Sequence, residues 1–393
     1  MGKLLVKQWR EVMNKFAFLI IGSLFLLSNY YIGRKFLSIL AQFSFFKHPL
    51  ILWLIIGGLA LTSMLTLLLF DANVGGLIGK IGSYWLSFWF LSFVIFGLSD
   101  LVLKIAKKII TVQTKSELIV WLVSTVLIVV LFCYGSWQAQ QIKTISYQVT
   151  IDKSASNRPK TVKAVLISDL HLGYVNDAKK LEKIVTKINQ LHPDIVFISG
   201  DLFDGNYKAL QDTQQMEKQF KRLSSTYGTY LCWGNHDAGE TFEKMKALVK
   251  ASNITLLEDE MTVVGEELLV VGRKDSSPIG SQDGSRKSIQ EQFNKVGNKL
   301  PKIILDHQPS NIDEYKHANE LILSGHTHQG QIFPFNLVTK AYFTVDYGYY
   351  RKNENSPQVI VSSGVGTWGP PMRIGTQSEI VQIDITLNGD HAK

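Results

Sequence analysis

The feature that most constrains this chain is a series of four apolar stretches within its first 140 residues. Inside a membrane every backbone N–H and C=O group must be paired within its own segment, so an apolar stretch that enters lipid has to be helical. Each stretch is about long enough to cross ~30 Å of hydrocarbon at 1.5 Å per residue. The stretches are Phe16–Gly33, Leu50–Phe70, Ser83–Ser99 and Leu118–Trp137. One of them alone could be a buried helix of a soluble domain, but four in succession predict a transmembrane helical region over residues 1–140.

The first stretch could instead be a cleaved signal peptide, because four basic residues precede it. However, the following "SNYYIG" offers no small-x-small cleavage site, and further spans follow, which favours a retained helix. Asp71, Lys80 and Asp100 lie at or near the ends of the predicted spans. Because transporters and channels more often carry ionisable residues in mid-span, we expect an anchor or a lipid-binding platform.

Basic residues are concentrated around the apolar stretches. The formal net charge is +8, and we attribute much of it to membrane flanks rather than to a nucleic-acid surface. In "LVLKIAKKIITVQTK", lysines and aliphatic residues alternate at helical spacing, which fits either a basic amphipathic helix on the membrane or the flank of a span. With four spans, both termini lie on the same side of the membrane as the second loop. The first and third loops, on the opposite side, carry slightly more basic residues. The sequence therefore predicts a multi-pass membrane protein whose C-terminal half is extracytoplasmic.

The pattern changes after residue 140. The chain holds only Cys133 and Cys232, so no disulfide framework is implied. Residues 141–160 are predicted to form a polar linker and the entry to the domain. In the following region, 161–393, short apolar strands alternate with helical patterns. One such helix has apolar residues at helical spacing from Leu181 to Leu191, with Asn176 as a candidate cap. The alternation predicts an α/β domain, whose ligand sites gather at the carboxyl ends of its strands.

Metal-binding residue types follow five of the predicted strands. Five of the nine histidines fall at these strand ends, each among Gly, Asp or Asn. Any one of them could be a solvated loop residue, but the ordered set indicates a site. The candidate metal ligands are Asp169, His171, Asp201, Asn235, His307, His326 and His328, with His236 beside them.

This donor set suits some metal ions better than others. Carboxylates, imidazoles and an amide form a mixed oxygen and nitrogen environment that fits two divalent ions. We expect Mn²⁺ first, with Fe, Zn²⁺ or Mg²⁺ as alternatives, rather than Ca²⁺ or thiolate-bound metals. Seven ligands exceed the needs of one ion, so the economical arrangement is two ions about 3.5–4 Å apart with a bridging carboxylate.

The blocks "DLH", "GDLFD", "GNHD", "DHQP" and "GHTHQGQ", in this order, resemble the calcineurin-like metallophosphoesterase superfamily from about Thr161 onward. Within it, "HTHQGQIFP" and "SSGVGTWGPPMRIGTQSEI" resemble membrane-associated bacterial enzymes related to UDP-2,3-diacylglucosamine pyrophosphatases. That branch usually has glycine at the position of Gln329 and often proline at the position of Ser378. Neither position is expected to bind metal, but Gln329 bears on the shape of the substrate pocket.

The resemblance implies a two-sheet sandwich flanked by helices, with one ion held by Asp169, His171, Asp201 and His328. It implies a second ion held by Asp201, Asn235, His307 and His326, with Asp201 as the bridge. His236 is then the catalytic residue, as proton donor to the leaving oxygen or as a contact to the phosphoryl group. Three acids are left open between a role in orienting ligands and an ordinary place in a turn. They are Asp204, Asp237 and Asp306.

Together these features predict a membrane-anchored, dinuclear-metal phosphohydrolase. The expected substrate contains a phosphodiester or pyrophosphate bond and is lipid-linked or part of the cell envelope; the other expected partners are membrane lipids. A nuclease or nucleotide phosphodiesterase is the alternative enzyme, although no Lys/Arg run lies near the five motifs and no nucleic acid is expected. A non-catalytic metal-containing binding module is a further alternative, and transport by the helical region is a third.

Overall fold

The structure is a computed structural model that describes residues 2–43, 47–68, 72–153, 159–279, 285–296 and 300–388. By residue contacts the chain divides into two compact units. The first comprises Met1–Leu69 and Leu77–Tyr134, and the second comprises Phe70–Gly76 and Gly135–Lys393. Each unit is described in turn.

The first unit is helical, as the sequence predicts. Its helices are α1 (Gly2–Leu40), α2 (Pro49–Leu68), α3 (Ala72–Ile109) and α4 (Thr114–Gln138). Three described segments are long and apolar enough to cross a membrane: Pro49–Thr66, Gly76–Ile109 and Thr114–Gln138. They coincide with three of the four predicted spans. The other, Phe16–Gly33, lies within α1, but its first residues are outside the part of the chain whose side chains are described, so it stays a prediction.

Asp100 is placed differently from the sequence expectation. Because α3 continues to Ile109, Asp100 lies inside the helix rather than at the end of a span. Its carboxylate accepts hydrogen bonds from Lys35 Nζ at 2.6 Å and from the Tyr31 hydroxyl at 2.7 Å, both on α1, and from Trp121 Nε1 on α4 at 3.2 Å. Asp100 therefore joins three helices of the bundle through a paired charge, which is how ionisable residues are accommodated between membrane helices.

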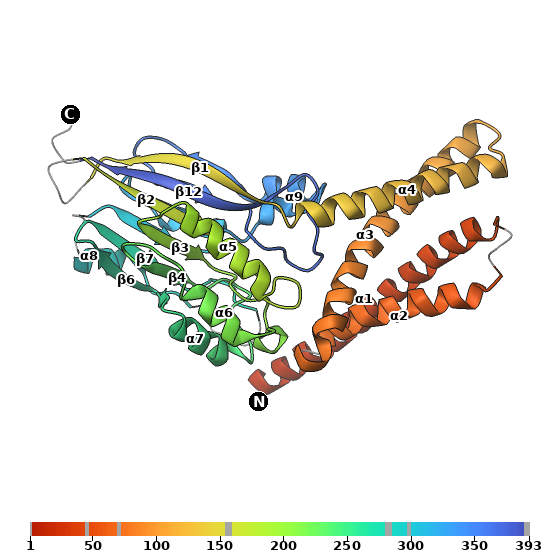
Figure 1. The fold of residues 1–393 in the computed structure, drawn as a ribbon, viewed down its shortest axis with the longest axis horizontal. Helices are drawn as coiled ribbons and strands as arrows, with labels where there is room; N and C mark the ends of the chain where they lie inside the picture. Colours follow the sequence, from red (N-terminus) through yellow and green to blue (C-terminus); the bar gives the residue numbers. More distant parts are fainter. Residues whose placement is uncertain are drawn as a thin grey trace. The chain divides into compact units, whose positions relative to one another are not determined.

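The second unit contains two six-stranded sheets (Figure 1). The first sheet has the order β1 (Ile142–Ile151), β12 (Ser378–Leu387), β2 (Lys160–Ile167), β3 (Ile195–Ser199), β4 (Thr229–Cys232), β5 (Thr255–Leu256). The second has the order β10 (Gly348–Arg351), β11 (Gln358–Val361), β9 (Glu320–Ser324), β8 (Lys302–Leu305), β7 (Leu268–Gly272), β6 (Glu260–Val264). Strands β2 to β5 run parallel, as do β7, β8, β9 and β11. The predicted α/β class and the two sheets implied by the resemblance are confirmed.

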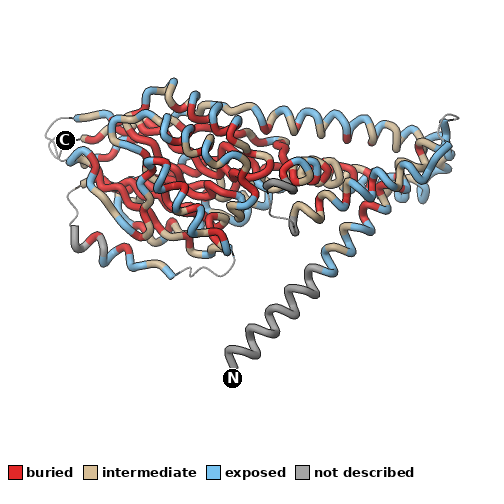
Figure 2. The backbone as a smooth tube through the Cα atoms, turned by 60° about the horizontal axis from the view of Figure 1, so that its bottom comes forward, coloured by how far each residue is buried: buried red, intermediate tan, exposed pale blue. Residues whose placement is uncertain are grey.

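Apolar side chains bury both faces of the central strands. Residues of β2 alternate between two clusters: Leu166 packs with Phe197 and Ile303 between the sheets, whereas Ile167 belongs to a cluster on the other face. That outer cluster includes residues of α5 (Ala178–Gln190), α6 (Thr213–Phe220) and α7 (Phe242–Ala251). Figure 2 shows the resulting concentration of buried residues in this unit. Burial on both faces explains why these strands are nearly continuous apolar runs.

Two local expectations are corrected by the structure. The segment 141–160, predicted as linker and domain entry, contains β1, which pairs in parallel with β12 over ten residues, Ile142 to Ile151, so half of it is a full strand of the first sheet. The cap of α5 is Asp177, whose carboxylate accepts the backbone N–H of Lys180 at 3.1 Å, and not Asn176. Because Asn176 precedes the capping position, its side chain is available for another role near the strand ends.

Removing the large buried side chain between the sheets should destabilise the second unit. We expect Phe197→Ala to lower its free energy of unfolding by about 3–5 kcal/mol, because a cavity is left in a closely packed core. The measurement is denaturant unfolding of the detergent-solubilised full chain, with Val263→Ala on the exposed side of β6 as the control. Equal small effects of both substitutions would contradict this account of the core.

Candidate metal centre

The carboxyl ends of five strands, three from one sheet and two from the other, meet at one place. Asp169 and His171 follow β2, Asp201 follows β3 and Asn235 follows β4. From the second sheet, His307 follows β8, while His326 and His328 follow β9. The structure brings all seven predicted ligands together, because the two sheets pack face to face with these strand ends on the same side.

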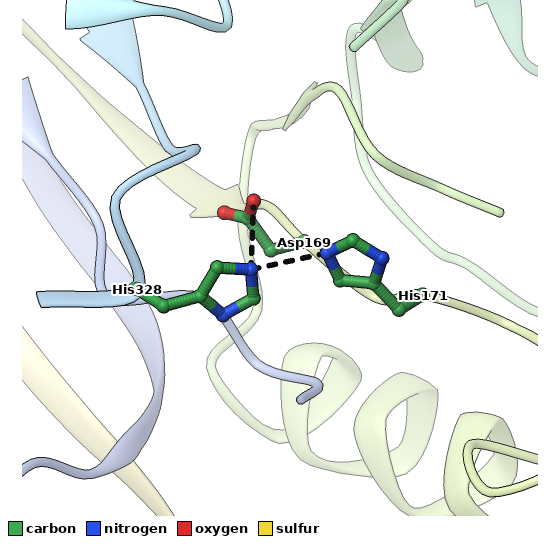
Figure 3. Close-up of side chains that lie close together, drawn as sticks. All are labelled: Asp169, His171 and His328. Carbon is green, nitrogen blue, oxygen red and sulfur yellow. Dashed lines mark hydrogen bonds and ion pairs between the residues drawn. The ribbon is translucent and has the colours of Figure 1, made fainter. Parts of the chain in front are cut away.

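Asp169, His171 and His328 form one group of converging donor atoms (Figure 3). The Nε2 atoms of His171 and His328 lie 3.0 Å apart, and His328 Nε2 lies 3.5 Å from Asp169 Oδ1. The Asp201 carboxylate completes the set, with Oδ2 at 3.6 Å from His171 Nε2. This is the group that the resemblance assigns to one ion.

Asp201, His307 and His326 form a second group. Asp201 Oδ2 lies 3.2 Å from His307 Nε2. The side-chain oxygen of Asn235 lies 3.2 Å from His307 Nε2 and 2.9 Å from His326 Nδ1. The same Asp201 oxygen therefore approaches imidazoles of both groups, which is the position required of a bridging carboxylate.

Most of these residues have a backbone conformation that L-amino acids rarely adopt. Asp169, His171, Asp201, His326 and His328 have φ angles of 53°, 43°, 49°, 72° and 49°. Left-handed conformations at non-glycine residues cost of the order of 1 kcal/mol or more each, so the surrounding contacts must impose them. Such strain is typical of sites in which side-chain placement takes precedence over local stability.

Two glycines permit the close approach of neighbouring loops. A Cβ atom on Gly325 would clash with the Asp169 carboxylate, and one on Gly234 would clash with that of Asp201. The backbone N–H of His326 donates to Asp169 Oδ1 at 3.0 Å, and that of His236 donates to Asp201 Oδ1 at 2.8 Å. These acids are thus fixed in orientation by the backbone of the loops beside them.

Burial and neighbouring charges together set the protonation of the imidazoles. Burial and the neighbouring His307 lower the pKa of His326 to about 3. Burial, followed by His171 and Arg373, lowers the pKa of His328 well below its ordinary value. Although burial acts in the opposite direction, the adjacent His307 holds the pKa of Asp201 below its ordinary value. Although burial acts in the opposite direction, Asp204 raises the pKa of His171 and Asp201 raises the pKa of His307 well above its ordinary value. Metal ions bind the neutral imidazole and the ionised carboxylate, so cations bound here would release the protons of these two histidines.

The donor set therefore fits a pair of divalent cations. Lone pairs of imidazole, carboxylate and amide groups converge within the two clusters, which a buried site without a cation would leave poorly compensated. With two nitrogen and two oxygen ligands in each implied set, the site favours borderline transition metals over Ca²⁺.

His236, the predicted catalytic residue, lies at the edge of the centre. Its ring is half-buried, with its centroid 5.1 Å from that of His171 and 5.6 Å from that of Trp368. Burial lowers its pKa, although Asp201 acts in the opposite direction. A neutral imidazole at this position carries one N–H that can donate to an oxygen bound beside the cations.

The three acids left open by the sequence have separate roles. Asp204 Oδ1 lies 3.3 Å from His171 Nδ1 and can orient that imidazole. Asp237 is buried and accepts backbone N–H groups of Leu202, Phe203 and Gly234, so it ties two ligand loops together. Asp306 does not contact the proposed ligands through its carboxylate. That carboxylate accepts hydrogen bonds from Arg286 at 2.7 Å and from the Tyr315 hydroxyl at 2.6 Å.

Sequence reasoning missed two residues that support the centre. Arg373 is fully buried, and its guanidinium donates to the carbonyls of Ser363 at 2.7 Å, Gly366 at 2.9 Å and His328 at 3.4 Å. Asn176 donates to the carbonyls of His171 at 3.0 Å and Thr367 at 3.1 Å. Arg373 thereby connects the loop of His328 to the segment 363–367, and Asn176 connects the loop of His171 to the same segment. The block "GVGTWGPPMR" was the available signal for Arg373, but no residue type in it suggests such a position.

The structure accounts for the unusual residue Gln329. It has φ 52° and ψ 33°, which is left-handed backbone, and its N–H donates to Thr327 Oγ1 at 3.1 Å. Glycine adopts this conformation without steric cost. The left-handed backbone therefore explains why the resembling enzymes usually have glycine at this position. Gln329 therefore places a half-buried side chain beside His328, at a position whose backbone conformation suits glycine.

Comparison with known proteins identifies this set of loops. Residues 162–330 match the family model described as calcineurin-like phosphoesterase. The chain carries a calcineurin-like metallophosphoesterase domain. A Danio rerio protein named transmembrane protein with metallophosphoesterase domain is 31% identical over 269 residues, which cover 65% of this chain and 60% of that protein.

Bacterial relatives match the metallophosphoesterase domain as well. An uncharacterized metallophosphoesterase of Helicobacter pylori strain J99 is 34% identical over 226 residues, which cover 57% of this chain and 60% of that protein. One from Aquifex aeolicus is 28% identical over 265 residues, covering 67% of this chain and 98% of that protein. The chain thus aligns with about three fifths of the length of the first relatives. These names support a metal-dependent phosphoesterase with membrane-type relatives, and they specify no substrate.

A methyl group on Gly325 should disrupt metal binding. Gly325→Ala places Cβ against the Asp169 carboxylate and Ser168, so we expect the full chain to lose at least half of its bound metal while the helical content is kept. The measurement is elemental analysis of the purified protein together with circular dichroism. Gly97→Ala in α3, where no atom lies within 4 Å of the added Cβ, is the control. Full metal content in Gly325→Ala would contradict the assigned ligand geometry.

Proposed function

We propose that this protein is a membrane-anchored, dinuclear-metal phosphohydrolase that cleaves a phosphodiester or pyrophosphate bond in a lipid-linked or cell-envelope substrate. The observation that carries the proposal is the shared Asp201 carboxylate, which lies 3.2 Å from His307 and 3.6 Å from His171 and so joins two donor groups into one centre. We propose Asp169, His171, Asp201 and His328 as ligands of one ion, and Asp201, Asn235, His307 and His326 as ligands of the other.

The bound cations, with Mn²⁺ as the first candidate, would supply a water of lowered pKa and neutralise charge on the phosphoryl oxygens. The chain's own residues set the geometry around them. Asp169 and Asp201 are held by backbone N–H groups, and Asp204 orients His171. His236 lies next to the centre without belonging to either ligand set, and its N–H can donate to the leaving oxygen.

The lipid part of the proposal rests on the helical unit. Three candidate membrane spans precede the metallophosphoesterase domain, so the domain operates next to a bilayer. The resemblance of "HTHQGQIFP" and the later "GVGTWGPPMRIG" block to enzymes related to UDP-2,3-diacylglucosamine pyrophosphatases supports a lipid-linked phosphate substrate. A domain anchored in this way meets such substrates at the level of the lipid headgroups.

Substitutions in the centre should separate catalysis from folding. We expect the purified full chain to hydrolyse an aryl phosphodiester when Mn²⁺ is supplied and to lose this activity after treatment with a chelator. Asp201→Asn, which weakens the bridge, and His236→Ala, which removes the proposed donor, should each reduce kcat/KM by at least about 10². Only Asp201→Asn should also lower the metal content. Equal rates for the wild type and both variants would refute the proposal.

The side of the membrane can be tested directly. We propose that the metallophosphoesterase domain is extracytoplasmic, since more basic residues lie in the loops between the predicted spans than beside the termini. Protease added to intact spheroplasts should then cleave the C-terminal unit, whereas a cytoplasmic marker protein stays intact. Cleavage only after lysis would place the domain in the cytoplasm.

A further inference from the structure

Helix α9 (Phe335–Tyr342) directs its apolar side chains away from the protein, the reverse of an ordinary surface helix. Tyr342 is 79% exposed, Val338 61% and Leu337 57%. The residues turned inward include polar ones: Thr339 Oγ1 donates to Asp346 at 2.8 Å. No residue of this described helix is buried.

The exposed apolar side chains continue on both sides of the helix. Phe333, immediately before it, is 57% exposed, and Trp368 in the neighbouring loop is 53% exposed. We call this set the α9 surface: Phe333, Phe335, Leu337, Val338, Tyr342 and Trp368. A contiguous group of large apolar side chains on the outside of a domain indicates an interaction with another apolar phase or molecule.

The α9 surface is connected to the end of a candidate membrane span. The last turn of α4, from Gly135, belongs to the second unit, and the Gly135 carbonyl accepts the backbone N–H of Arg373 at 2.9 Å. The next residue, Ile374, accepts the backbone N–H of Phe333 at 2.8 Å. Two backbone hydrogen bonds, each joining segments of the chain about 5 Å apart, thus connect the end of α4 to the start of the α9 surface. In Figure 1, α9 lies at the end of the domain where β1 begins.

The α9 surface is also fixed to the candidate metal centre. Gly330, two residues after His328, packs against the backbone of Phe335 and Asn336 so closely that a Cβ would clash there. Gln331 donates to the Trp368 carbonyl at 2.9 Å, and the Trp368 ring lies 5.6 Å from that of His236. These contacts therefore hold the α9 surface and the candidate metal centre in a fixed relation to each other.

We propose that the α9 surface inserts into the interfacial layer of the bilayer and holds the metal centre at the level of lipid phosphates. The headgroup region on one side of a bilayer is about 5–8 Å thick, so a surface this close to the end of a span lies within reach of the acyl-chain boundary. The outward aromatic and aliphatic residues, with exposed Lys340 among them, have the composition of a helix lying in that boundary. The catalytic part of this proposal, the placement of the metal centre at lipid phosphates, rests on the proposed function. Membrane contact by α9 does not depend on it.

Membrane contact can be measured without activity. In a Cys133→Ser background, where the remaining Cys232 is fully buried, a spin label is attached at Val338→Cys in the full chain reconstituted into phosphatidylethanolamine/phosphatidylglycerol vesicles. We expect its collisions with oxygen to exceed those with a water-soluble nickel chelate by several-fold. The matched control, Val263→Cys on the exposed side of β6, should favour the nickel chelate. Aqueous behaviour at residue 338, or protection from both reagents as in a protein interface, would overturn the proposal.

A charge on the α9 surface should impair hydrolysis of lipid substrates only. We expect Val338→Asp to reduce hydrolysis of diacylglycerol pyrophosphate in the same vesicles by at least about fivefold and to leave hydrolysis of a soluble aryl phosphodiester unchanged. Val263→Asp should affect neither substrate. Equal loss on both substrates would show that α9 serves the metal loops instead of the membrane. If the wild type hydrolyses neither substrate, the proposed function fails, and the spin-label result still decides the membrane contact.

Discussion

The Asp201 carboxylate, placed between imidazoles from two sheets, is the contact on which the arrangement of the site depends. His171 belongs to the loop after β2 in the first sheet, and His307 to the loop after β8 in the second. An acid that approaches both can hold its position only if the sheets are packed face to face with the ends of β2, β3 and β8 together. The apolar cluster between the sheets, including Leu166, Phe197 and Ile303, is therefore a condition for the site and not only for stability.

The backbone of the ligand loops is held in costly conformations by contacts that surround it. Left-handed φ angles at Asp169, His171 and Asp201 persist because buried groups such as Asp237 and Arg373 hydrogen-bond these loops or their neighbours. Glycines at close approaches, such as Gly325, remove side chains that would separate the strand ends. Gln329 is the opposite case, because it carries a side chain at a left-handed position that glycine would occupy without strain.

The two units meet different physical requirements. In the helical unit, many apolar side chains face outward, as expected of helices that could span a membrane, and the Asp100–Lys35 pair joins two of these helices. The second unit has the ordinary arrangement of a water-soluble domain, with an apolar interior and a polar surface. The α9 surface is the exception, since its apolar residues face outward beside the loop that carries His328.

The sequence by itself determined the helical region, the alternation of strands and helices, and the seven positions that we propose as metal ligands, because hydrophobic periodicity and short motifs are local properties. It also determined that His326 and His328 leave one strand end. Only the tertiary structure decided that β1 belongs to the first sheet, that Asn176 and Arg373 support the ligand loops, and that Asp306 binds Arg286. Those contacts join residues far apart in the chain, and their geometry follows from how the two sheets pack. The tertiary structure also decided that the apolar side of α9 faces outward. Only the packing of this short helix against the loop after β9 shows which of its sides faces the protein.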